Sequence, residues 1–199
     1  MRLSRKTVLI AGVVVVVLAV VLPLLLSGGG GGGPLSTLSQ GGQPIIDGSG
    51  VPVRPGQTQN ATAFIFNSAH EGVTLLSASL VPVRREPAAR LAHTAVYLNH
   101  SYDVGNASSS WPPKGDHVRP LRGAVIGHGQ TGILFAITGP ASGRGYTTAA
   151  GVKISYRWHG AVYTVIAWSA SVACGDQLSS ARCGQLTDRA QSLAIQQAG

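Results

Sequence analysis

The chain has 199 residues, a formal net charge of +8 at pH 7 and charged side chains at only 11% of positions. The basic residues form neither a dense block nor a helix-spaced face, which argues against nucleic-acid binding. The length allows one globular domain beside smaller segments, and a mild positive charge suits a surface near anionic lipid or wall polymer.

Residues 8–26 form an apolar run without a single charged side chain. As an α-helix at about 1.5 Å per residue, the run would be about 28 Å long, close to the ~30 Å hydrocarbon core of a bilayer. It also lacks the polar face of a helix packed on a protein surface. The run therefore predicts a transmembrane helix, so the lipid bilayer is the first partner that the sequence indicates.

Three cations, Arg2, Arg5 and Lys6, precede this run. Basic residues beside a membrane span tend to stay in the cytoplasm, which predicts that residues 1–7 are cytoplasmic and that everything after Leu26 is exported. A cleaved signal peptide is the alternative. The length of the run and the absence of a small-residue cleavage site favour an uncleaved signal anchor, and hence a single-pass protein of the plasma membrane.

Residues 27–44 read as a linker, because six consecutive glycines, Gly28 to Gly33, are followed by further Gly, Ser and Pro. Such a composition is typical of a flexible coil that buries no core. We therefore expect the domain to stand away from the membrane and to rotate.

Residues 45–174 alternate short apolar runs with Gly, Pro, Asn and Ser clusters, the pattern of an all-β sandwich. We expect a mainly β, antiparallel, immunoglobulin-like sandwich of about 7–8 strands. The predicted strands are residues 51–53, 62–67, 74–83, 95–99, 121–126, 131–138, 151–158 and 161–172.

The most regular alternation lies in residues 151–158, followed by His159-Gly160. A tight turn there would place Ile154, Tyr156 and Trp158 on one face with Tyr163, Val165 and Ala167, for a loop of either His159-Gly160 or Gly160-Ala161. Lys153 and Arg157 would be exposed on the opposite face. The second strand is also apolar at its other positions, which predicts that it is covered, at least in part, on both sides.

Two segments carry a family resemblance. The first has an Arg54-Pro55-Gly56-Gln57 turn, an apolar strand ending in Asn67, a short loop and a second apolar strand. The second is the hairpin from Gly151 with its strand running to Cys174. Together they resemble bacterial extracytoplasmic immunoglobulin-like domains of actinobacterial type. The resemblance implies the fold class and no functional residues.

Residues 175–199 form the predicted C-terminal tail. Cys174 and Cys183 are the only cysteines, and an exported location favours a disulfide between them. A weak helical period after Leu186 predicts either a short helix or a disordered tail, with Asp188 and Gln191 as a capping pair.

Sequence motifs give no catalytic or cofactor-binding site. Gly127 to Gly132 matches G-x-G-x-x-G, but a β run follows it instead of the helix that dinucleotide binding requires, so we interpret it as a hairpin turn. The histidines lack zinc-ligand spacings. We therefore expect no enzyme, no cofactor and no metal site. The six histidines are His70, His93, His100, His117, His128 and His159.

The long irregular segment 101–120 contains Trp111 together with Asp103 and Asp116. An exposed Trp111 is a candidate partner contact, although burial tendencies favour folding back over a sheet edge. The two aspartates are the one acidic pair within a single loop.

Three functions follow from these observations. The favoured one is a non-catalytic interaction or structural module of the cell envelope, with an unidentified protein or envelope-polymer partner. The second is an accessory subunit of another membrane protein. The third is an exported enzyme or metal carrier that uses the loop aspartates and histidines.

Overall fold

The structure of the protein, a computed structural model, describes residues 32–40, 43–97, 111 and 118–199. The predicted cytoplasmic segment 1–7 and transmembrane helix 8–26 lie outside these ranges. Within them, no helix combines the length and the apolar character that a membrane span requires.

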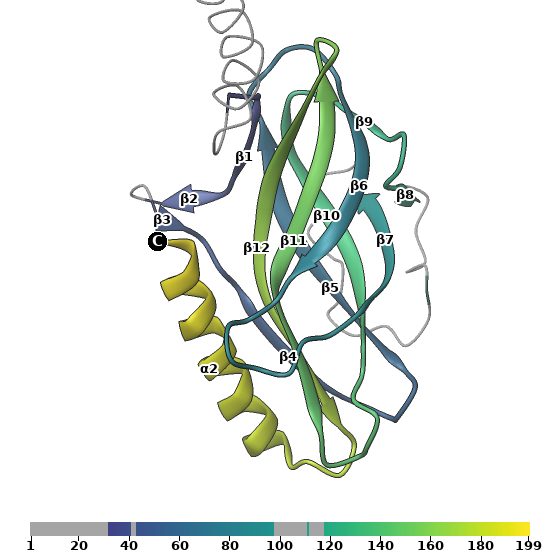
Figure 1. The fold of residues 1–199 in the computed structure, drawn as a ribbon, viewed down its shortest axis with the longest axis vertical. Coiled ribbons are helices and arrows are strands. Elements are labelled where there is room, and N and C mark those ends of the chain that lie inside the picture. Colours follow the sequence, from purple (N-terminus) through teal and green to yellow (C-terminus); the bar gives the residue numbers. More distant parts are fainter. Residues whose placement is uncertain (1–31, 41–42, 98–110, 112–117) are drawn as a thin grey trace, which may run out of the picture. The chain divides into compact units, whose positions relative to one another are not determined.

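The described residues are mainly β, with two five-stranded sheets that share a hydrophobic core (Figure 1). The first sheet has the order β1-β5-β10-β7-β8, with bounds Leu35–Thr37, Thr58–Asn67, Gly129–Thr138, Leu91–Tyr97 and Val118–Pro120. The second sheet has the order β4-β12-β11-β6-β9, with bounds Gly48–Val53, Ala161–Gly175, Tyr146–Trp158, Val73–Val81 and Val125–Ile126. A small ribbon of β2, Ser39–Gln40, and β3, Gln43–Pro44, and the helix α2, Ser180–Ala198, complete the described elements.

Each predicted strand region contains a strand, but the sheets differ from the expectation in two ways. The two sheets have ten strands instead of 7–8, and β4 pairs with β12 in parallel, so the second sheet is not antiparallel throughout. The predicted strand 121–126 begins only at Val125, because a turn with Gly123 at φ 82° occupies its first half. The predicted strand 95–99 is described only as far as Tyr97.

The β11–β12 hairpin has the predicted register. Ile154 pairs with Val165 and Tyr156 with Tyr163, and the loop is His159-Gly160, both at positive φ as a tight hairpin loop requires. Tyr156 is fully buried in the core, and Lys153 and Arg157 are exposed as expected. Trp158 is only half-buried, because it is the last residue of its strand.

Strand β12 packs against two hydrophobic clusters. Its odd-numbered residues Ala167 and Ala173 join the core between the sheets. Its even-numbered residues Ala170, Val172 and Cys174 contact a second cluster that includes α2. Figure 1 shows α2 along β4 and β12, on the half of the second sheet that lies away from the β11–β12 turn. The prediction that β12 is covered on both sides is therefore confirmed for its second half.

Two glycines of β4 let α2 approach the sheet closely. A Cβ at Gly50 would overlap the hydroxyl oxygen of Thr187, and one at Gly48 would lie 2.9 Å from the Gln191 side chain. Gln191 instead donates a hydrogen bond from Nε2 to the carbonyl oxygen of Ile46 at 2.7 Å. The strand and the helix are thus matched in shape as well as joined by a polar contact.

The predicted C-terminal tail 175–199 is mostly this helix of 19 residues, which is longer than the short helix expected and packs on the domain. Its N-cap is Ser179, whose hydroxyl accepts a hydrogen bond from the backbone N–H of Arg182. The expected capping pair is wrong, because Asp188 and Gln191 lie in the middle of the helix.

The predicted linker 27–44 is wrong for its described part. β1 pairs with β5, and Leu35 is only 4% exposed in the main core. Residues 31–199 form one compact unit. Because Leu35 and Ile46 bury their side chains, the described residues between them belong to the domain.

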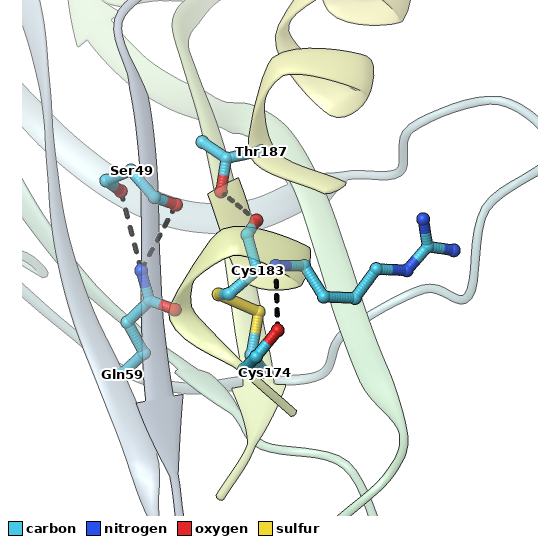
Figure 2. The surroundings of a disulfide bond; sticks show 7 residues. Ser49, Gln59, Cys174, Cys183 and Thr187 are labelled. Carbon is cyan, nitrogen blue, oxygen red and sulfur yellow. Dashed lines mark hydrogen bonds between the residues drawn. A yellow bond between two sulfur atoms is a disulfide. The ribbon is translucent and has the colours of Figure 1, made fainter. Parts of the chain in front are cut away.

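The disulfide joins Cys174 of β12 to Cys183 of α2, with both residues buried (Figure 2). Because β12 extends to Gly175, Cys174 lies inside a strand, beyond residue 172, where the predicted strand ended. Thr187 donates from its hydroxyl to the Cys183 carbonyl one turn earlier, at 3.0 Å. The bond therefore attaches the helix to the second sheet and does not connect the two sheets.

A pair of substitutions in β11 tests the packing of the hairpin. Tyr156→Ala should lower the free energy of unfolding by about 3 kcal/mol, because it removes a buried aromatic side chain and leaves a cavity. Lys153→Ala should change it by less than about 0.5 kcal/mol, since this side chain is exposed. Urea unfolding of the full chain in detergent, followed by circular dichroism, measures both. Equal and small effects would show that residues 151–172 are not a core hairpin.

Two glycines should respond to alanine in opposite directions. Gly50→Ala should destabilise the protein, because the new methyl group overlaps Thr187. Gly184→Ala should stabilise it by about 0.5–1 kcal/mol, because this glycine lies exposed in α2 with no atom within 4 Å of the added Cβ. Thermal unfolding of both variants checks the signs, and a neutral Gly50→Ala would contradict the close helix packing.

Candidate functional site

Three connections meet at one end of the domain, which we call the apex: residues 68–72, 127–128 and 159–160. The imidazole rings of His70 and His128 stack at 5.2 Å, and Glu71 forms an ion pair with His159 at 2.5 Å. Because these contacts join both sheets, the apex has a defined side-chain arrangement and not just three loose turns.

Asn67 holds the apex together from below. This residue is fully buried at the end of β5. Its Nδ2 donates to the carbonyl oxygens of Gly127 at 3.0 Å and of Ile126 and Glu71 at 3.3 Å. Its Oδ1 accepts from the backbone N–H of Ala69 at 3.0 Å. The Asn that ends the predicted strand is therefore a structural hub that fixes two of the three connections.

The histidines of the apex contact aromatic rings and an acid. His128 packs edge-on against Phe66, and His159 stacks on Trp158 at 4.2 Å. In the part of the chain that the structure describes, no group of three His, Cys, Asp or Glu residues could hold a metal ion. His100 and His117 lie outside the described residues. The apex thus offers amphipathic rings and exposed charge without a chelating geometry.

The polypeptide joins the fold at the apex. Both the backbone N–H and the hydroxyl of Ser68 donate to the carbonyl oxygen of Pro34, at 3.0 and 3.1 Å. A Cβ at Gly33 would overlap the Tyr156 hydroxyl and lie 3.0 Å from the ring of Tyr163. The last glycine of the hexaglycine run is therefore required by packing, and burial raises the pKa of Tyr156.

No described element covers the outer face of the second sheet near the apex. Its outermost row is a continuous set of paired residues across four strands, in which Val162 pairs with Arg157, Arg157 with Thr74, and Thr74 with Val125. Paired residues point to the same side of a sheet. We call the uncovered part the open face, with members Thr74, Ser77, Ser79, Val125, Lys153, Ser155, Arg157, Val162, Thr164 and Ile166.

The open face combines cations, hydroxyls and exposed aliphatic groups. Val162 and Val125 are 61% and 60% exposed, the most exposed of the large hydrophobic residues that the structure describes. None of the face's ten members is acidic, and the nearest described acid at the apex is Glu71, which pairs with His159. The face can therefore contact an anionic, partly apolar surface.

A second polar site holds α2 and is structural. The side chain of Glu86 is only 2% exposed; its Oε1 forms an ion pair with the Arg189 Nε, and its Oε2 accepts a hydrogen bond from the Tyr146 hydroxyl, both at 2.7 Å. The hydrogen bond to Glu86, together with burial, raises the pKa of Tyr146. Glu86 therefore connects Arg189 of α2 to Tyr146 of β11, and this carboxylate positions the helix.

The remaining predicted site residues are not brought together. The ring of Trp111 stacks on His93 at 5.3 Å and is half-buried, so it packs against β7. Asp103 and Asp116 lie outside the described residues. Residues 127–132 do not form a hairpin turn, because β9 and β10 belong to different sheets and the segment crosses between them.

Sequence reasoning missed the open face and Glu86. The alternation of Lys153, Ser155 and Arg157 was a signal for the first, because it predicts a solvent-facing row. What the sequence did not show is that α2 covers only half of this face. Nothing in the loop sequence around Glu86 distinguishes it from a solvated acid.

Comparison with known proteins gives no relative from which a role could be transferred. No family model matches the sequence, and no curated protein matches it significantly. The apex and the open face are therefore interpreted from their own geometry and chemistry.

Replacing Asn67 by Asp tests the hub of the apex. The new carboxylate would face three carbonyl oxygens that now accept hydrogen bonds, so Asn67→Asp should cost at least about 2 kcal/mol of unfolding free energy at neutral pH. Repulsion raises the folded-state pKa of such a carboxyl above its unfolded value of about 4, so the loss should be smallest below about pH 4 and grow to its full size as the pH rises through the folded-state pKa. Asn67→Ala, which removes the amide without adding a charge, is the control at the same position. A loss for Asn67→Asp that does not depend on pH would contradict the donor role.

Proposed function

We propose that this protein is a single-pass membrane protein that presents an exported, immunoglobulin-like β-sandwich as a non-catalytic interaction or structural module of the cell envelope. The observation that carries the proposal is the sequence of its first 32 residues: three cations, an apolar run of membrane length and a short glycine segment that leads directly into the folded domain. An apolar run of this length with basic residues before it favours an uncleaved anchor.

The strand arrangement supports the immunoglobulin-like part of the proposal. In constant-type immunoglobulin domains, strands A, B, E and D form one sheet and G, F and C form the other. The order β1-β5-β10-β7 and the order β12-β11-β6 follow the same scheme when the seven strands are lettered along the chain. The parallel β4, the short β8 and β9, and α2 are additions to that scheme.

The disulfide supports export. Disulfides persist in oxidising compartments outside the cytoplasm, and the two cysteines of this chain are bonded to each other. The bond joins a strand to a helix, whereas antibody domains join strands B and F, so it adds nothing to the immunoglobulin likeness.

A non-catalytic role is favoured because the buried Glu86 carboxylate is engaged by Arg189 and Tyr146. The candidate partner contacts are the open face and Trp111, which packs against β7. The roles as an accessory subunit, or as an enzyme or metal carrier, have no specific observation in their favour.

The topology is tested by a reporter and by the mature N-terminus. A reporter that is active only outside the cytoplasm should be active when fused after Gly199, because the N-terminal cations hold the start of the chain inside. Mass spectrometry of the purified protein should find a chain that begins at or near Met1. A new N-terminus close to Gly28 would replace the anchor with a secreted domain.

A further inference from the structure

We propose that the open face at the apex docks on an anionic lipid surface, so that the domain lies against the bilayer instead of standing away from it. The inference rests on the proposed membrane anchor and adds a partner and a contact surface to it. The central contact is the row Val162, Arg157, Thr74 and Val125.

The first argument is the reach of the chain. The apolar run ends at Leu26 and the described domain begins at Gly32, so only five residues lie between them. Fully extended, this stretch spans about 20 Å. The expected linker of 18 residues, 27–44, would have allowed about three times that distance. The pairing of β1 with β5 removes most of this freedom.

The second argument is where the chain joins the domain. Gly33 lies against Tyr156 and Tyr163, which pair with each other in the β11–β12 hairpin. The pair Arg157 and Val162 is the next one along the same hairpin, toward the turn. The row on the open face therefore lies at the same position along the hairpin as the point where the chain enters the fold. A short connection to the anchor keeps this end of the domain near the membrane.

The third argument is the chemistry of the row. A lipid surface presents anionic headgroups above an apolar layer, and the row presents the cation Arg157 between two exposed valines. Lys153 adds a second cation on the same face of β11, four residues from Arg157, and the hydroxyls of Ser155 and Thr164 can bond to phosphate oxygens. At the apex itself, Trp158 and Tyr163 are half-buried rings of the kind enriched at membrane interfaces.

The charge and the exposed valines of the open face favour an anionic lipid surface over a second copy of the chain or a wall polymer. A second copy of the chain would bring Arg157 and Lys153 against the same cations, with no acid on the face to compensate. An anionic wall polymer would satisfy the cations but would leave Val125 and Val162 exposed to water. An anionic lipid surface satisfies both features of the face.

The experiment measures tryptophan quenching by brominated lipids in the full chain. The protein is reconstituted into phosphatidylcholine vesicles with or without phosphatidylglycerol, and the substitution Val162→Trp is compared with Gln185→Trp. Gln185 is exposed on the first turns of α2, at the opposite end of the domain from the β11–β12 turn (Figure 1). The added fluorescence of Val162→Trp should be quenched at least twofold more than that of Gln185→Trp, and only with phosphatidylglycerol present.

A charge variant provides the second arm. Adding Lys153→Gln and Arg157→Gln should lower the ratio of docked to undocked domain by about fivefold for each cation. The matched control, Arg54→Gln with Arg182→Gln, removes two exposed cations that lie outside the open face and should leave the ratio unchanged. Thermal unfolding of the Lys153→Gln, Arg157→Gln variant should match that of the parent, because both side chains are exposed.

Three results would overturn the docking: equal quenching at the two positions, quenching that does not depend on phosphatidylglycerol, or concentration-dependent burial of the Val162→Trp side chain without lipid quenching, which would indicate a second copy. The anchor is judged separately by washing the vesicles with carbonate. Release of the full chain would refute the proposed anchor, while the quenching still decides the docking.

Discussion

Strand β12 packs against two hydrophobic layers, and the arrangement of the domain depends on this. One side of the strand completes the core between the sheets, and the other side receives α2 over its second half. The alternation of β12 therefore fixes the position of the helix, and the disulfide and the polar contact of Arg189 with Glu86 hold it there. A shift of one residue that turns β11 over would bury Lys153 and Arg157 and expose Ile154 and Tyr156.

The same constraint produces the open face. α2 packs on the part of the second sheet where β4 pairs with β12, from Ala170 to Gly175, and on the neighbouring part of β11 that includes Ala150. Between that region and the β11–β12 turn, the outer side of the sheet carries cations and hydroxyls with aliphatic residues at its margins. Because β1 belongs to the domain, the chain joins the fold beside this uncovered region. The fold and the short connection to the proposed anchor together put this solvent-exposed sheet face near the bilayer in the proposed membrane-bound protein.

The parts of the fold predicted from the sequence are those with strong local patterns. The alternation of residues 151–158 gave the hairpin and its faces, and the turn at Pro55-Gly56 and the strand ending at Asn67 were equally clear. The prediction of the linker failed because it relied on composition alone. Gly33 belongs to a glycine run typical of linkers, yet it lies against Tyr156. Contacts between segments that are distant in the sequence have no local pattern that predicts them. Examples are the contacts of Glu86 with Tyr146 and Arg189, and the contact of Asn67 with Gly127. The parallel position of β4 and the extent of α2 also depend on such contacts.

The account requires that the domain begins at β1 and not at residue 45. Hydrogen exchange of the full chain in phosphatidylglycerol-containing bilayers tests this most directly. The backbone amides of residues 35–37 and of α2 should be protected to the same order of magnitude as those of the β11–β12 hairpin, because they unfold together with the core. If the amides of residues 35–37 exchange at the rate of an unstructured chain while the hairpin stays protected, these residues belong to a long flexible linker. That result would contradict a domain that begins at β1.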